Sequence, residues 1–125
     1  MNIPGFIARQ FYVAGSLRNT DSGWELKAHH PMGNGVLTGV GQMSVDGHQI
    51  APESVTAQRS GDAQPIRAGD VTRLNPVHVS KGDQVTLHVS GAPLAAGEHH
   101  LEVELFELNL GRLAFAISDS VPEGV

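Results

Sequence analysis

The chain has 125 residues, the usual length of a single domain, and it contains no cysteine. Disulfides, thiolate nucleophiles and cysteine-based zinc sites are therefore excluded. The chain has eight Lys and Arg residues and thirteen Asp and Glu residues, so its net charge is −5. This negative charge and the lack of a basic cluster argue against binding to nucleic acid or to an anionic membrane surface.

The N-terminal segment, residues 1–8, is predicted to be a short flexible lead-in. The first ten residues lack the basic flank and the apolar centre of a signal peptide. No apolar run approaches the roughly 20 residues that a membrane-spanning helix needs. We therefore expect a cytoplasmic location.

The next part of the chain is predicted to form strands. Two extended segments, residues 9–14 and 16–20, are followed by a turn signal, Asp21-Ser22-Gly23. Residues 23–30 then alternate between apolar and polar side chains, as in a half-buried strand. The apolar face of this strand is predicted to hold Trp24, Leu26 and Ala28.

A loop and an interrupted strand follow. The loop, residues 31–35, reads Pro-Met-Gly-Asn-Gly, and the strand covers residues 36–45. Gly39 and Gly41 lie within the strand, which predicts a bulge or a close approach of the backbone. The Asp46-Gly47 pair predicts a two-residue hairpin turn.

The remaining segments before residue 90 contain turns and one predicted hairpin. Residues 52–56 predict a single helical turn, and residues 58–72 predict a long loop with one weak strand. Two strands, residues 77–80 and 84–90, are predicted to pair as a hairpin around Lys81-Gly82-Asp83.

The last third of the chain predicts two more strands, residues 99–108 and 113–118, followed by a frayed tail at residues 119–125. Alternation also predicts which side chains point inward. The predicted inward-facing residues of this part and of the preceding strand are Val85, Leu87, Val89, Leu101, Val103 and Leu105.

Seven to nine short strands separated by turns predict an all-β fold. We expect an antiparallel β-sandwich, or a partly open barrel, formed by a single domain over residues 1–125. The flexible ends are expected at about residues 1–8 and 119–125.

Seven histidines are the most conspicuous candidates for chemistry. The adjacent pairs His29-His30 and His99-His100 point to opposite faces of a strand, so neither pair can chelate one metal without a bend. If their strands were neighbours, His88 could approach His100 or Glu102 and form a metal site or an acid–base pair. A solvated polar face is the other interpretation. Because no catalytic motif is present, we predict no catalytic residue and no metal ligand in this chain.

Three stretches, in their order and spacing, resemble the small beta subunit of bacterial C-glycoside deglycosidases. Together they extend over most of residues 11–106. The stretches are Ser16-Leu17-Arg18-Asn19 with the following Trp24-Glu25-Leu26-Lys27, then Val45-Asp46-Gly47 with Ile50-Ala51-Pro52-Glu53-Ser54-Val55, and then Leu94-Ala95-Ala96-Gly97-Glu98-His99 with Leu101-Glu102-Val103-Glu104-Leu105.

The resemblance implies a β-sandwich that supports a larger alpha subunit in a hetero-oligomer. In that family the alpha subunit has a sugar-isomerase-like barrel and holds the divalent metal, manganese or magnesium, with the catalytic residues. The complex is a lyase of carbohydrate metabolism that cleaves the carbon–carbon bond of 3-oxo C-glycosides. The resemblance therefore implies a beta subunit without a cofactor of its own.

The predicted partner-facing or substrate-bordering region is residues 29–36. Its candidate residues are His29, His30, Met32, Asn34 and Val36. Two other functions stay open on the sequence: a stand-alone binding domain for a carbohydrate or a protein, and a small metal-dependent enzyme that uses His88, His100 and Glu102.

Overall fold

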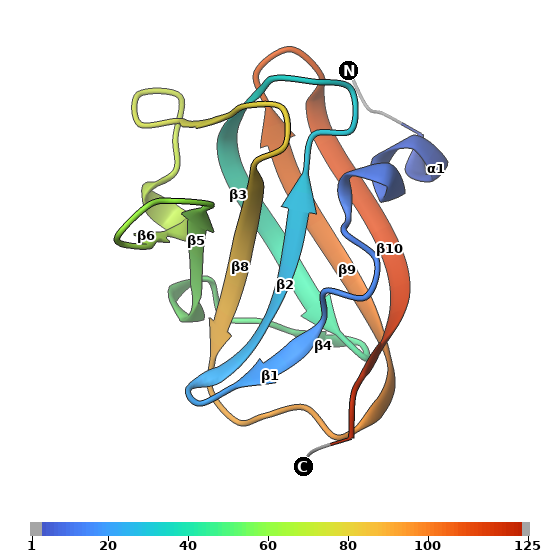
Figure 1. Cartoon of the computed structure of the whole chain (residues 1–125). Helices are drawn as coiled ribbons and strands as arrows, with labels where there is room; N and C mark the ends of the chain where they lie inside the picture. The colour runs from blue at the N-terminus through green and yellow to red at the C-terminus, as the bar shows by residue number, and fades with distance from the viewer. Residues whose placement is uncertain (1–3, 124–125) are drawn as a thin grey trace.

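The computed structural model describes residues 4–123 and shows two antiparallel sheets packed face to face, which confirms the all-β sandwich (Figure 1). The first sheet has the order β1 (Arg18–Thr20), β2 (Gly23–His29), β8 (Gln84–Ser90), β5 (Val55–Arg59) and β6 (Ile66–Arg67). The second has the order β10 (Gly111–Val121), β9 (Gly97–Glu107), β3 (Gly35–Val45) and β4 (His48–Gln49), with β7 (Val77–Val79) also paired to β3.

Four short helical segments complete the described part of the chain. They are α1 (Gly5–Ala8) and the 3-10 turns η1 (Arg9–Phe11), η2 (Pro52–Ser54) and η3 (Ala68–Asp70). No helix among residues 4–123 is long and apolar enough to cross a membrane.

The core lies between the sheets and is built by the predicted alternation. Every predicted inward-facing residue is buried, including Trp24, which belongs to the core. Leu26 and Leu87 lie opposite each other on β2 and β8 and are both fully buried. Burying a leucine side chain contributes about 1.5–3 kcal/mol, so the burial of such side chains between the sheets holds the two sheets together.

The bulged strand and the hairpin turn are also confirmed. The pairing of β3 with β9 shifts between Leu37 and Gly39 and again between Val40 and Met43. The turn from β3 to β4 has positive φ angles at Asp46 (51°) and Gly47 (82°), as a two-residue hairpin turn of the primed type requires.

The extended segment predicted at residues 9–14 is wrong for residues 9–11, which form η1, whereas Tyr12 is extended and forms a β-bridge with Ala28. α1 precedes η1, and the backbone carbonyl of Pro4 accepts hydrogen bonds from the amides of Ile7 and Ala8, both at 3.0 Å. Ala8 and Phe11 are buried, and their spacing of three residues places both on one side of a helical turn. Over six residues, alternation alone could not distinguish this arrangement from a strand.

The hairpin predicted between residues 77–80 and 84–90 is wrong as well. β7 pairs with β3 in the second sheet, whereas β8 pairs with β2 and β5 in the first, so the chain crosses from one sheet to the other at residues 81–83. Two buried side chains, Val77 and Val79, hold β7 on its sheet. A short turn between two strands does not by itself decide whether they pair.

The structure corrects three smaller predictions. β5 occupies residues that were assigned to a helical turn and a loop, although η2 confirms the turn itself. Ten strands are present among residues 4–123, one more than the upper expectation, because β4 and β6 have only two residues each. The ends expected to be flexible carry regular structure at residues 5–8 and 119–121, and Ala8 is fully buried. Residues 1–3 and 124–125 lie outside the described residues.

The carboxylate of Asp119 explains why β10 continues to Val121. It accepts a hydrogen bond from the hydroxyl of Tyr12 and one from the backbone amide of Gly15 at 2.9 Å. These contacts tie the N-terminal segment to the end of the last strand. Burial of the Tyr12 side chain and its hydrogen bond to Asp119 raise the pKa of Tyr12 well above its usual value of 10.0.

Candidate functional site

All five predicted interface residues lie at one end of the sandwich, which we call the loop end. The β2–β3 loop, the β7–β8 connection and the β9–β10 turn meet there, and α1 lies beside them (Figure 1). Hydrogen bonds join these segments. The backbone amide of Leu108 donates to the carbonyl of Val36 at 2.9 Å, and the amide of Lys81 donates to Oδ1 of Asn34 at 2.8 Å.

Glu107 is the central polar residue of the loop end. Its side chain is buried, and its carboxylate accepts hydrogen bonds from the backbone amides of Val36 (2.9 Å), Asn109 (2.7 Å) and Leu110 (2.8 Å). Burial alone would raise the pKa of Glu107, but these three donors and the nearby His30 outweigh it and lower the pKa from 4.5. The ionised carboxylate thus fixes the β9–β10 turn to the start of β3.

The two predicted histidines of the loop end make internal contacts. The ring of His30 meets the ring of Phe11 edge to face, with centroids 5.1 Å apart, and its Nδ1 accepts a hydrogen bond from the amide of Met32 at 3.2 Å. Nε2 of His29 lies 3.0 Å from the carbonyl of Gln10. Together with Asn34, these side chains shape the loop, while Met32 points into solvent and is 63% exposed.

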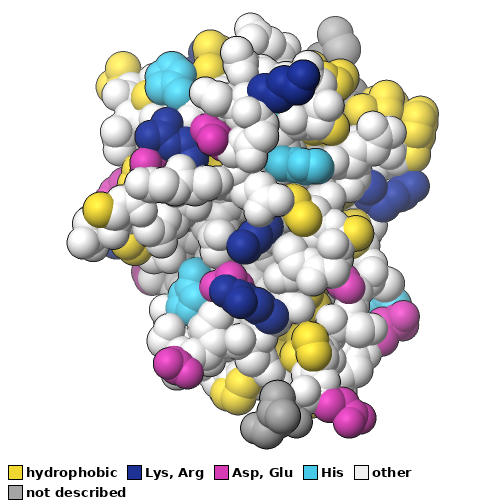
Figure 2. Space-filling model, in the orientation of Figure 1, with side chains coloured by type: hydrophobic (Ala, Val, Ile, Leu, Met, Phe, Trp, Pro, Cys, Tyr) yellow, Lys and Arg dark blue, Asp and Glu magenta, His cyan; other side chains and the backbone are white. Residues whose placement is uncertain are grey.

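Four large apolar side chains are strongly exposed among residues 4–123: Phe6 (63%), Met32 (63%), Leu74 (99%) and Leu108 (47%). They come from α1, the β2–β3 loop, the turn at residues 72–75 and the β9–β10 turn. The β2–β3 loop and the β9–β10 turn lie together at the loop end with α1 on their right, whereas the turn at residues 72–75 lies on the opposite, left side of the molecule (Figure 1). In the matching surface view, apolar side chains gather at the upper right, where α1 lies (Figure 2).

Sequence reasoning found only Met32 of these four residues. Phe6 and Leu74 are isolated apolar residues in segments without a clear period, so the sequence carries no signal that separates them from core residues. Leu108 ends the strand predicted over residues 99–108 and falls on the outward side of its alternation, which was the signal that could have identified it. The position of Leu108 beside the loop that carries Met32 is a consequence of the topology.

The cavity between the sheets leaves little room for a buried substrate, whereas three open surface hollows of about 350–400 Å³ have the size of small-ligand sites. One of these hollows lies at the loop end and is lined by Asn34, Val36 and Asn109. Beneath His30 and Val36, a cavity of about 40 Å³ opens between the sheets, lined mainly by apolar side chains such as Leu87 and Leu105. This volume suits a water molecule or two rather than a sugar. Every buried side-chain nitrogen or oxygen among residues 4–123 already has a hydrogen-bond partner.

The predicted approach of His88 to His100 or Glu102 is wrong. His88 lies on β8 in the first sheet, opposite Glu25, whereas the other two residues lie on β9 in the second sheet. Nε2 of His88 is 2.9 Å from the hydroxyl of Thr20. Within the described part of the chain, no three His, Asp or Glu side chains gather as metal ligands would.

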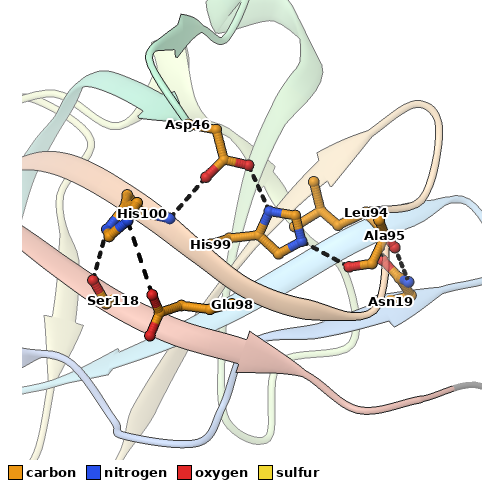
Figure 3. A network of polar contacts seen from close by, with 8 residues as sticks. All are labelled: Asn19, Asp46, Leu94, Ala95, Glu98, His99, His100 and Ser118. Atoms are coloured by element: carbon orange, nitrogen blue, oxygen red, sulfur yellow. Dashed lines mark hydrogen bonds and ion pairs between the residues drawn. The ribbon is translucent and has the colours of Figure 1, made fainter.

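A second polar cluster, which the sequence did not reveal, lies at the opposite end of the sandwich (Figure 3). Nδ1 of His99 is 2.5 Å from Oδ2 of Asp46, and Nε2 is 2.7 Å from the carbonyl oxygen of Ala95. The pKa of His99 is raised from 6.5 by its hydrogen bonds to Ala95 and Asp46. That of Asp46 is lowered from 3.8, first by the amide of His100 and then by His99. Since both ring nitrogens are occupied, this histidine is not available as an acid or base for a substrate.

A third polar contact crosses the outer face of the second sheet. The carboxylate of Glu104 forms an ion pair with Nε of Arg112, and its Oε1 accepts a hydrogen bond from the backbone amide of Gln42 at 3.2 Å. The hydrogen bond from the Arg112 side chain is the largest effect on the pKa of Glu104 and lowers it from the usual value of 4.5. A Cβ at Gly41 would lie 2.1 Å from Oε1 of Glu104, so a larger residue there would displace this carboxylate. These groups satisfy one another and hold the sheet, so the loop end is the candidate site.

Comparison with known proteins adds a family. No curated protein matches the chain. The family model described as hydroxymethylglutaryl-CoA reductase, N-terminal domain, matches residues 7–122, which include all ten strands. The chain therefore belongs to the family described as hydroxymethylglutaryl-CoA reductase, N-terminal domain.

Proposed function

We propose that this chain is a non-catalytic accessory beta subunit of a cytoplasmic C-glycoside deglycosidase, a lyase that cleaves the carbon–carbon bond of 3-oxo C-glycosides. Its partner is a larger alpha subunit whose sugar-isomerase-like barrel holds the divalent metal and the catalytic residues. Support comes from the three stretches that resemble such beta subunits and from the β-sandwich fold. The observation that carries the docking role is the exposure of Met32 and Leu108 on two neighbouring loops that hydrogen bonds join at the loop end.

Exposed apolar side chains that gather in one region mark interaction sites, because single scattered ones are the norm on a soluble surface. Transferring a side chain such as Met32 or Leu108 from water into an interface contributes about 1.5–3 kcal/mol when burial is complete. The loops that carry these two residues are held by Glu107 and by the contact between Asn34 and Lys81. Docking would therefore order little additional backbone, which favours a stable complex.

The five predicted interface residues take two roles in this proposal. Met32 and Val36 contact the partner or border its substrate, since Met32 is exposed and Val36 is half-buried at the mouth of the small cavity. The other three, His29, His30 and Asn34, position the loop through their contacts within the chain.

The family match favours a second partner. Because the matching model describes the N-terminal domain of hydroxymethylglutaryl-CoA reductase, the loop end could dock onto a reductase of that kind instead of a barrel. The docking role is the same in both cases, and only the identity of the larger protein differs. A stand-alone domain that binds a carbohydrate or a protein is the remaining alternative.

Replacing Met32 or Leu108 with Asp should weaken the complex at least about tenfold, because an unpaired charge would be buried in the interface. The test is coexpression with the barrel protein and, separately, with the reductase, followed by size exclusion and titration calorimetry. Ala92→Asp is the matched control, since Ala92 is exposed in the loop at residues 91–96, on the other end of the sandwich.

We expect the wild-type chain and the control to form a complex with the barrel protein, and both loop-end variants to stay folded but unbound. Assembly with the reductase alone would replace the first partner by the second. If the wild-type chain binds neither protein and changes the activity of neither, the accessory role itself is wrong.

A further inference from the structure

His99 lies at the start of β9, is 8% exposed, and faces an acceptor with each ring nitrogen. The carbonyl oxygen of Ala95 can only accept a hydrogen bond, and an ionised Asp46 carboxylate can likewise only accept. Both ring nitrogens must therefore carry protons, so the ring in this geometry is an imidazolium (Figure 3).

This ring joins two segments that have few other ties. Asp46 belongs to the β3–β4 turn, where its Oδ1 also accepts the backbone amide of His100 at 2.9 Å. Ala95 belongs to the loop at residues 91–96. That loop has a second tie in the side chain of Asn19, which exchanges two hydrogen bonds of 2.8 Å with the backbone of Leu94.

The charged groups around the ring leave Asp46 as its main partner. On β9, Glu98 and His100 point to the opposite face, and the nearest atoms of these two side chains are 3.9 Å apart. On β10, the residue opposite His99 is Asp119, but its carboxylate is engaged by Tyr12 and by the amide of Gly15. The loop at residues 91–96 itself contains no charged residue.

We propose that His99 is a pH-sensitive latch that holds the loop at residues 91–96 when its ring is doubly protonated and releases it when the ring loses a proton. A neutral ring keeps one N–H, which stays with the Asp46 carboxylate because a charge-assisted hydrogen bond is the stronger one. Nε2 then turns a lone pair toward the carbonyl oxygen of Ala95, and that contact becomes repulsive. Loss of this contact loosens the loop beside Leu94, whose side chain is half-buried against the core and whose backbone Asn19 still holds.

The direction of the pH dependence follows from the two pKa shifts. The raised pKa of His99 means that its stabilising contribution is fully present below 6.5 and is lost as the pH rises through the folded-state pKa. The lowered pKa of Asp46 means that its contribution is present above 3.8 and is lost only as the pH falls through a value below that. The latch is therefore closed at weakly acidic pH and opens on the alkaline side of 6.5.

The test uses the isolated wild-type chain. Ring nitrogen NMR gives the pKa of His99, and amide hydrogen exchange at residues 94–98, corrected for the intrinsic pH dependence, gives the opening constant of the loop. For each unit by which the pKa exceeds 6.5, the opening constant should rise tenfold between low and high pH. Exchange in the β2–β8 core should show no such change.

Two variants separate the latch from a purely structural contact. His99→Gln should make loop exchange independent of pH, and Asp46→Asn should lower the pKa of His99. His100→Gln is the matched control, since His100 is exposed and hydrogen-bonds only at the surface with Ser118. A wild-type His99 that titrates at or below 6.5, or one that titrates without any change in loop exchange, would overturn the proposal whether or not the variants fold.

Discussion

The Gly23→Ala variant should lose about 3 kcal/mol or more of its free energy of unfolding, or fail to fold at 25 °C. Gly23 opens β2 and pairs with Thr20 on β1 and with Ser90 on β8. A Cβ at this position would lie 1.9 Å from the carbonyl oxygen of Val89, and the φ angle of +156° is one that side chains rarely adopt. The atom in the way is backbone of the central strand, so relief requires separating β2 from β8.

Urea unfolding followed by circular dichroism measures this loss. Gly69→Ala is the matched control, because a Cβ there meets no atom within 4 Å and the backbone has no positive φ. We expect the control to stay within about 1 kcal/mol of wild type or to be slightly more stable, since alanine restricts the unfolded chain. A Gly23→Ala variant as stable as the control would show that β2 and β8 can separate locally at little cost.

Glu107→Gln should cost about 2–3 kcal/mol, although it preserves the size of the side chain. The carboxylate accepts the amide of Val36 with one oxygen and those of Asn109 and Leu110 with the other. A glutamine has only one acceptor oxygen, so its NH₂ group must face at least one of these amide donors. The loop end would lose the tie between β3 and the β9–β10 turn.

The pH dependence of this difference provides a second measurement. Because the pKa of Glu107 is lowered from 4.5, its contribution is fully present above 4.5 and is lost as the pH falls through the folded-state value. The difference in the free energy of unfolding between wild type and the Glu107→Gln variant, measured with urea, should therefore become smaller below pH 4.5. Glu98→Gln, at an exposed side chain, should change stability by no more than about 0.5 kcal/mol at any of these pH values. An equal loss in both variants would mean that the charge, and not its hydrogen bonds, matters.

Local sequence patterns predicted those parts of the fold that depend on neighbouring residues. The alternation in β8 and β9 identified the core side chains, and Asp46-Gly47 identified a turn whose positive φ angles suit these two residues. The glycines of β3 indicated its bulges. In each case, the physical cause lies within a few residues along the chain.

The predictions that failed concern features that depend on residues far apart in the chain. The segment 77–80 was paired with the wrong strand, because a three-residue connection fits both a hairpin and a crossing between sheets. The approach of His88 to His100, which required their strands to be neighbours, does not occur, because the sequence does not tell which strands share a sheet. The sequence predicts a flexible lead-in where α1 forms and a strand where η1 forms, because burial of Ala8 and Phe11 against the rest of the sandwich decides the structure of these residues.

The candidate site shows the same division. The sequence by itself determined an acidic, cysteine-free β domain, and it pointed to the loop at residues 31–35 through its glycines and proline. Only the tertiary structure brought the exposed Leu108 of the β9–β10 turn to the loop that carries Met32, and only it joined Asp46 to His99 across 53 positions of the chain. The reason is physical: strand periodicity is a local property, whereas the meeting of distant side chains depends on strand order and register, which the packing of the whole core selects.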